Sequence, residues 1–289
     1  MTTLGQHEGA KSMTGGNVTM PDHDRLDLTE IVDFDRYPIA EPGRPASRIV
    51  GRCRAELAED GACQLDGFMR PAAAQAVLDE AKMLSSKAFR TDATHNAYFT
   101  KVTAGIPARD PRGVRLHTSK RALGYKYWGA SSPLRILYQW DGLVTFLKDV
   151  LELQGLYRDA DPMGACSVMF HDDGDELGWH FDNSEFAVTL MLQDCVEGGE
   201  FEYVPAIRAA DDENFAAVRA VLEGAREPVR SLRADPGTLT LFRGRYSLHR
   251  VTPVRGTTAR VNAVLAYAST AGHRLTPLNR RLFYGPDED

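Results

Sequence analysis

The sequence is poor in cysteine, and it has no long apolar run. The four cysteines lie among apolar neighbours and show no spacing typical of a metal site: Cys53, Cys63, Cys166 and Cys195. We therefore expect reduced, partly buried thiols in a cytoplasmic protein. No apolar stretch approaches the ~20 residues that a membrane-spanning helix needs, and the N-terminus has no apolar signal-peptide core. A membrane or secreted protein is not expected.

The chain also lacks a strong excess of charge. It has 34 Lys and Arg residues against 40 Asp and Glu residues, a net charge of −6. Nucleic acids and anionic membrane surfaces select basic patches, so neither is the expected main partner. Apolar material is plentiful, because 43% of the 289 residues are hydrophobic, enough for one large core. No repeat of 20–50 residues is present, which excludes a solenoid or propeller.

A polar N-terminal segment is followed by two parts with different sequence patterns. Residues 1–25 have no apolar period, which predicts a disordered tail. A helical part is expected over about 44–155, and short runs rich in Val, Leu, Phe and Thr fill about 160–270. Many short strands with tight turns predict a sandwich or a barrel. The expected fold class is therefore α+β, with residues 26–289 forming one domain in which N-terminal helices pack on a β-barrel or jelly roll.

The spacing of apolar residues sets the expected elements. Helices are predicted at 45–59, from Pro71 to Leu84, over 133–153 with a break near Gly142, and at 212–222. Strands are predicted at 164–170, 178–182, 186–193, 199–204, 229–234, 238–243, 247–252 and 259–268. The helix at 212–222 is expected to cover the mouth of the barrel, with a solvated surface helix as the alternative.

The most specific motif is His180-Phe-Asp182. In a strand, residues i and i+2 point to the same face, so His180 and Asp182 should aim together. His249 lies in a second predicted strand and can complete the set. Two imidazoles and one carboxylate on one side of an iron(II) ion leave the other coordination positions open for reaction. The predicted metal ligands and catalytic residues are therefore His180, Asp182 and His249.

Arg260 follows the last histidine by eleven positions. The turn at Pro253–Gly256 lies midway between His249 and Arg260, so the two are expected to face each other across an antiparallel hairpin. An arginine there can bind a carboxylate with two parallel hydrogen bonds. This geometry suits 2-oxoglutarate, whose keto-acid end chelates iron while its far carboxylate meets the arginine.

His171-Asp-Asp173 is a rival His-x-Asp pair. It ends a strand and enters an acidic turn at Gly174, whereas His180 and Asp182 lead directly into the apolar strand that begins near Phe186. The sequence therefore favours His180 and Asp182. A lone His-x-Asp is usually a surface hydrogen-bonded pair, but the distal histidine and arginine make the full set more specific.

These motifs together resemble the iron(II)/2-oxoglutarate dioxygenases. The closer resemblance is to the bacterial group that contains the free-amino-acid radical halogenases and their hydroxylase relatives. It covers about 60–285, on Phe170-His-Asp-Asp-Gly174, Trp179-His-Phe-Asp182, Gly198-Gly-Glu-Phe201, Gly237-Thr-Leu-Thr-Leu-Phe-Arg-Gly244 and Leu248-His-Arg-Val-Thr-Pro-Val254.

This resemblance implies a double-stranded β-helix, a jelly-roll or cupin-like core. It implies iron(II) and 2-oxoglutarate as cofactors, molecular oxygen as co-substrate, His180, Asp182 and His249 as ligands, and Arg260 as the 2-oxoglutarate anchor. Halogenases of this group carry glycine or alanine where the carboxylate ligand would be, which leaves room for chloride. Asp182 occupies that position here, so hydroxylation of a free amino acid or a small derivative is expected.

Five further residues are candidates for substrate contacts. Arg121 could meet the substrate or 2-oxoglutarate, or could be a surface charge. Asn183 directly follows the ligand pair and could bind substrate or only cap the strand end. His95, Asn96 and Tyr98 could line the mouth of the site or make only structural hydrogen bonds.

Two other functions remain open from the sequence. A protein- or peptide-modifying hydroxylase with a regulatory role would use the same ligands in an open groove. A non-catalytic metal-binding β-barrel would not need both the ligand set and Arg260, so it is the weaker alternative. The motif does not identify the substrate.

Overall fold

The computed structural model describes residues 27–286 apart from 41–42, 102–104 and 108. The tail expected over residues 1–25 lies outside the described residues. The α-helices of this part are α1 (Leu28–Ile31), α2 (Arg44–Glu59), α3 (Pro71–Met83), α4 (Pro133–Gln139), α5 (Asp141–Val150), α6 (Phe215–Leu222) and α7 (Pro277–Tyr284). In the described ranges no helix combines the length and apolarity required to cross a membrane.

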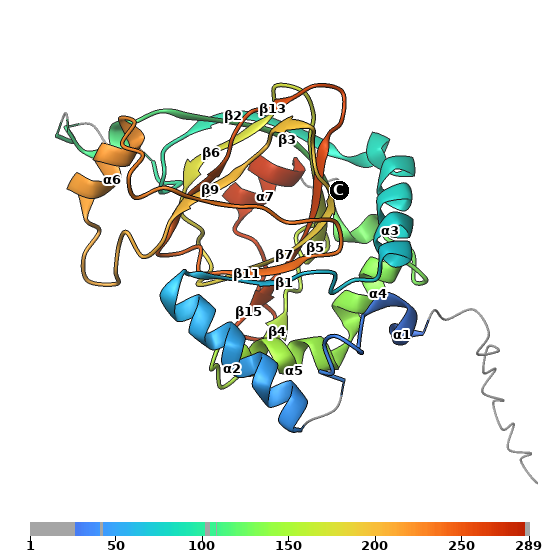
Figure 1. Ribbon diagram of the computed structural model, residues 1–289. Coiled ribbons are helices and arrows are strands. Elements are labelled where there is room, and N and C mark those ends of the chain that lie inside the picture. The colour runs from blue at the N-terminus through green and yellow to red at the C-terminus, as the bar shows by residue number, and fades with distance from the viewer. Residues whose placement is uncertain (1–26, 41–42, 102–104, 108, 287–289) are drawn as a thin grey trace, which may run out of the picture.

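The strands form one large antiparallel sheet and two small ones (Figure 1). The strands are β1 (Ala62–Leu65), β2 (Phe89–His95), β3 (Leu116–Leu123), β4 (Tyr157–Arg158), β5 (Cys166–His171), β6 (Glu176–His180), β7 (Ala187–Gln193), β8 (Glu197–Gly198), β9 (Phe201–Val204), β10 (Arg230–Leu232), β11 (Leu239–Phe242), β12 (Leu248–Val251), β13 (Val254–Arg255), β14 (Arg260–Leu265) and β15 (Tyr267–Ala268).

The large sheet has the order β1-β11-β7-β14-β5-β3-β6-β12-β9-β10, with β2 also paired to β3. Strand β3 joins its two halves, because 121–123 pair with β5 while 118–119 pair with β6. The sheet thus curls into a half-barrel with β1-β11-β7-β14-β5 on one side and β6-β12-β9-β10 on the other. The expected α+β jelly-roll class is confirmed.

The N-terminal part is less helical than expected. Strands β2 and β3 pair along 89–95 and 116–122, inside the stretch of about 44–155 that the sequence assigned to helices. Charged and polar residues alternate irregularly there, which hides the strand period. The expected helices themselves appear as α2, α3 and the pair α4 and α5, which is interrupted at Trp140.

Strand alternation gives the curled sheet two different faces. In β14, Val261, Ala263 and Leu265 belong to the main apolar core, whereas the intervening Arg260 and Asn262 line a cavity inside the curl. Strands β5, β7 and β11 alternate in the same way. Helices α2, α3, α4 and α5 add side chains to this core outside the barrel, and Figure 1 shows α2 and α5 below β1 and β11.

The prediction that His249 and Arg260 face each other across a hairpin is wrong. Strand β12 pairs with β6 and β9, whereas β14 pairs with β5 and β7. The intervening β13 pairs with β8 instead of folding back on β12. His249 and Arg260 therefore stand on opposite halves of the curled sheet and meet only as walls of the same cavity.

The helix that borders this cavity is α7, not α6. Residues Asn279, Phe283 and Tyr284 of α7 line it, and α7 contacts β2 and β3. Helix α6 packs instead on a separate apolar cluster with Phe181 and Leu248, and Figure 1 shows it at the far edge of the fold. The sequence-based expectation that 212–222 covers the barrel mouth is therefore wrong, since its apolar residues find a partner elsewhere.

Candidate metal centre

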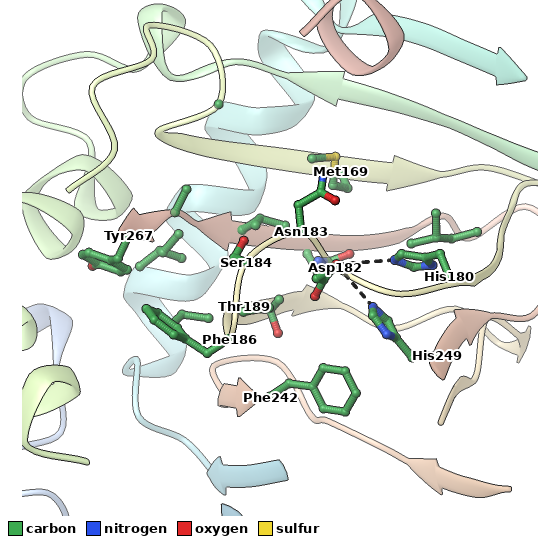
Figure 2. A pocket seen from close by; sticks show the side chains of 18 of the residues that line it. Met169, His180, Asp182, Asn183, Ser184, Phe186, Thr189, Phe242, His249 and Tyr267 are labelled. Atoms are coloured by element: carbon green, nitrogen blue, oxygen red, sulfur yellow. Dashed lines mark ion pairs between the residues drawn. The ribbon is translucent and has the colours of Figure 1, made fainter. Parts of the chain in front are cut away.

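His180, Asp182 and His249 converge inside the curled sheet. His180 ends β6, and its register partner across the sheet is His249 in β12. The Nε2 atoms of His180 and His249 lie 3.6 and 3.5 Å from Asp182 Oδ1. Figure 2 shows both imidazoles pointing at this carboxylate. The three candidate ligand atoms lie within 4.8 Å of one another, a group that can hold a metal ion.

Backbone hydrogen bonds fix the position of the motif. Beyond β6, the Phe181 amide donates to Ala97 O at 2.8 Å and the Asp182 amide donates to Gly244 O at 3.1 Å. The extended conformation therefore continues past the end of the strand. This keeps the spacing of two that aims His180 and Asp182 to the same side.

The two histidines present the same nitrogen to the centre. His180 Nδ1 lies 2.9 Å from Gly178 O, and His249 Nδ1 lies 2.9 Å from Ser247 O. A carbonyl oxygen only accepts, so each Nδ1 carries the proton and each Nε2 keeps its lone pair. Hydrogen bonds of this kind orient metal-binding imidazoles and fix their tautomer.

The local electrostatics keep His180 and Asp182 in metal-binding form. Burial, followed by the nearby charge of His249, lowers the pKa of His180 to about 4. Burial opposes ionisation of Asp182, but the charges and hydrogen bonds of His249 and His180 outweigh it and hold the pKa of Asp182 below its usual range. At neutral pH the site therefore offers a neutral imidazole from His180 and an ionised carboxylate.

Aromatic rings enclose the histidines. The ring of Phe99 lies 5.5 Å from that of His180, and Phe242 and Phe201 lie 4.8 and 5.6 Å from His249. These rings restrict the imidazoles and reduce the access of water to the centre.

Gly244 leaves the space that the Asp182 carboxylate occupies. A Cβ at position 244 would overlap Asp182 Oδ2, and the backbone of Gly244 needs no left-handed conformation. The glycine is therefore required for side-chain room and not for its flexibility.

Gly244→Ala is expected to turn the Asp182 carboxylate away and to weaken metal binding by about 10–100-fold, as loss of a supporting contact does at other metal sites. Titration of the metal into the protein measures this. Gly51→Ala is a matched control, because a Cβ at Gly51 meets nothing within 4 Å. Equal metal affinity for Gly244→Ala and the wild type would contradict the assignment of Asp182 as a ligand.

The centre opens into a cavity of about 490 Å³. Met169, Asn183, Ser184 and Thr189 surround the metal centre in Figure 2, and Tyr267 lies towards the other end. At that end Asp159 Oδ2 accepts a hydrogen bond from His273 Nδ1 at 2.6 Å.

Arg260, the residue predicted to anchor 2-oxoglutarate, lies in the wall of this cavity. Its side chain is buried, and Nη1 donates to Asn262 Oδ1 at 2.7 Å.

The rival pair does not form a ligand set, because His171 faces the cavity while Asp173 Oδ1 accepts from the Gly256 amide in an exposed turn.

Among the five substrate candidates, only Asn183 lines the cavity. Arg121 faces the other way and forms a two-pronged ion pair with Asp172, with 2.7 and 3.0 Å between the atoms. The other three make mainly local structural contacts: His95 Nε2 to Thr118 Oγ1 at 2.6 Å, Asn96 to the Tyr98 and Thr100 amides, and the Tyr98 ring to Phe181 and Phe215.

Lys120 is a site residue that the sequence reasoning missed. It precedes Arg121 in β3, and strand alternation turns it into the cavity while Arg121 turns out. An assignment of β3 as a strand would have given this distinction. The α7 residues that line the cavity belong to no recognisable sequence motif. They reach the cavity only because the C-terminal end of the described chain packs against β2 and β3.

Solved structures share this fold at low sequence identity. SnoN, described as a non-heme alpha-ketoglutarate-dependent epimerase from nogalamycin biosynthesis, has a TM-score of 0.53 and 17% identity over 78% of this chain and 81% of its own. AviO1 from Streptomyces viridochromogenes Tue57 has a TM-score of 0.53 and 16% identity over 77% of this chain and 96% of its own. Identities this low establish the fold alone. No curated protein sequence matches the chain.

The curled jelly roll has the fold of SnoN, and it encloses a His-Asp-His group that can hold a metal ion. The family model described as Halogenase D matches residues 46–277, and the chain belongs to this family. The superfamily resemblance that the sequence motifs carry is thereby confirmed.

Proposed function

We propose that the protein is an iron(II)- and 2-oxoglutarate-dependent dioxygenase that hydroxylates a free amino acid or a small amino-acid derivative. The observation that carries the proposal is the convergence of two imidazole Nε2 atoms and one carboxylate in a cavity wall. Two nitrogens and one oxygen suit a ferrous ion and leave coordination positions free for other ligands. The residues present therefore fit the metal.

Iron(II), 2-oxoglutarate and dioxygen together supply the oxidising power for C–H hydroxylation, with 2-oxoglutarate converted to succinate and carbon dioxide. The protein contributes three actions. His180, Asp182 and His249 hold the metal, Arg260 offers a buried guanidinium to a carboxylate, and the aromatic rings around the histidines limit water. The protein is proposed to act in the cytoplasm as one domain.

Asp182 favours hydroxylation over halogenation. In the resembled halogenases a small residue at this position leaves a place for chloride. Here the carboxylate fills that place, and Gly244 accommodates it. A member of the Halogenase D family can thus carry a metal centre with no vacancy for halide.

The cavity favours a small substrate over a peptide. A volume of about 490 Å³ lies in the range of small-molecule sites. Polar groups are present at both ends, with Asn183, Ser184 and Thr189 near the metal centre and the Asp159–His273 pair beyond. Tyr267 lines the cavity, and its buried hydroxyl has no hydrogen-bond partner in the described part of the chain. Such a site can orient a molecule with several polar groups.

Succinate release tests the proposal. The iron-loaded protein should form some succinate from 2-oxoglutarate without substrate, and the true substrate in a panel of free amino acids and small amines should stimulate release. Mass spectrometry should then show a product that has gained one oxygen atom. A protein that forms no succinate would instead be a non-catalytic metal-binding barrel, and stimulation by peptides alone would favour the protein-modifying alternative.

A further inference from the structure

Three basic side chains stand side by side on the inner face of the curled sheet. Arg260 in β14 is the register partner of His171 in β5. In the neighbouring pair of strands Arg121 is opposite Phe170, so one step along the antiparallel ladder Lys120 of β3 is opposite His171. Arg260, His171 and Lys120, here called the basic row, all line the cavity that contains the metal centre.

The polar atoms of the basic row have few partners. His171 is only 2% exposed, and neither of its ring nitrogens has a hydrogen-bond partner among the residues that the structure describes. Lys120 is 6% exposed, and its Nζ lies 4.6 Å above the ring of Phe283 with no carboxylate paired to it in the described part of the chain. Arg260 is 7% exposed, and within the described ranges its one hydrogen bond goes to the neutral Asn262. The charge of Asp194 also acts on this guanidinium.

Without a ligand, the basic row lowers the stability of the folded protein. Buried polar groups normally have a hydrogen-bond partner, and buried charges are normally paired. Burial lowers the pKa of Lys120 to about 8 while the charge of Asp182 opposes this shift, so the amine remains mainly cationic at neutral pH. Arg260, Lys120 and His171 thus face a cavity in which the carboxylate of Asp182 belongs to the metal centre.

We propose that the basic row is a three-point site for the distal carboxylate of 2-oxoglutarate, in which Lys120 and His171 act together with Arg260. This inference rests on the proposed function. Arg260 and Lys120 donate from charged groups, and neutral His171 donates from one ring nitrogen. The distal carboxylate thus meets three donors, while the keto-acid end of the cosubstrate points to the metal. The histidine of the rival motif thereby acquires a role that is not metal binding.

The three-point site also explains how this chain would select its cosubstrate. A 2-oxo acid of the same length without a distal carboxylate leaves the basic row unpaired. Sites that bury polar groups for one ligand reject an analogue that cannot pair with them. The preference for 2-oxoglutarate over 2-oxopentanoate therefore measures the contribution of the row.

The test is calorimetric titration of both acids into the manganese(II)-loaded protein, for the wild type and for Lys120→Met and His171→Leu. Lys120→Met should weaken 2-oxoglutarate binding by about 10–100-fold, the range of one hydrogen bond to a charged group. His171→Leu should weaken it by about 3–10-fold, as for a neutral donor. Binding of 2-oxopentanoate should change by less than about 2-fold, because the lost contact involves only the distal carboxylate.

Arg121→Met is the matched control, since Arg121 is the next residue of the same strand but faces away from the cavity. It should leave the affinity for both acids unchanged. Thermal unfolding gives a second readout. Lys120→Met should raise the melting temperature of the ligand-free protein, because it removes an unpaired buried charge, and should reduce the stabilisation by 2-oxoglutarate.

Three results would overturn the inference. Equal weakening of both acids would show that Lys120 only supports the cavity. Unchanged 2-oxoglutarate affinity with weakened substrate binding would place the substrate's carboxylate on the row. A lower melting temperature for ligand-free Lys120→Met would give the lysine a structural role. Failure of the wild type to bind 2-oxoglutarate would instead contradict the proposed function itself.

Discussion

His249→Ala is expected to lower iron(II) affinity by more than about 100-fold and to abolish succinate formation. The magnitude follows because loss of a mere supporting contact already costs about 10–100-fold at a metal site, and here a ligand is removed. The Nε2 of His249 lies 3.5 Å from Asp182 Oδ1, and among the described residues no other histidine belongs to this group of candidate ligands.

Anaerobic titration of iron(II), followed by metal analysis of the desalted protein, measures this loss. His117→Ala is the control, because His117 lies on β3 at the surface and pairs with Glu176 and Asp92 at 2.9 and 3.0 Å. It should bind iron as the wild type does. Retention of tightly bound iron by His249→Ala would show that the metal lies elsewhere.

Asp182→Gly is expected to suppress hydroxylation and to let chloride bind at the metal. Removal of the carboxylate next to Gly244 leaves two neighbouring positions without side chains, and this opens space at the metal for a chloride ion. Hydroxylation should fall by at least about 100-fold because the metal loses a ligand. Chloride should now bind, as it does where the family carries a small residue at this position.

The measurement is the absorption of the anaerobic complex of iron(II) and 2-oxoglutarate, recorded with and without chloride. Chloride should shift the charge-transfer band in Asp182→Gly and leave the wild-type band unchanged. Asp173→Gly, which removes the exposed acid of the rival motif, should behave like the wild type. If chloride affects Asp182→Gly no more than it affects the wild type, Asp182 does not decide between hydroxylation and halogenation.

The sequence predicts the local part of the site well. A spacing of two on a strand aims His180 and Asp182 together, and this depends only on backbone geometry. The apolar alternation of β5, β7, β11 and β14 is equally local, because one face packs on helices and the other lines the cavity. These strands were therefore predicted close to their observed bounds.

Long-range pairing was predicted less well, since a sequence does not state which strands become neighbours. The turn near residue 254 suggested that His249 and Arg260 share a hairpin. In the structure β13 pairs with β8 and sends β14 to the other half of the sheet. Both residues still reach the cavity, because a curled sheet brings its two inner faces together.

The alternation of side chains along a strand decides which of two adjacent residues faces the cavity. Arg121 and Lys120 are equally basic neighbours, and only the strand assignment of β3 tells which one faces inward. That strand lacks an apolar period, so the sequence offered no phase. The sequence disfavours His171 as a ligand, because its motif enters an acidic turn, but its place beside Arg260 follows only from the pairing of β14 with β5.

The most direct measurement is the absorption spectrum of the wild-type protein with one equivalent of iron(II), titrated anaerobically with 2-oxoglutarate. Chelation of the keto-acid by iron produces a charge-transfer band that needs no knowledge of the substrate. We predict a band that saturates at one equivalent of 2-oxoglutarate and is absent in His249→Ala. Iron-loaded wild-type protein that develops no band would contradict an iron(II)/2-oxoglutarate centre at His180, Asp182 and His249.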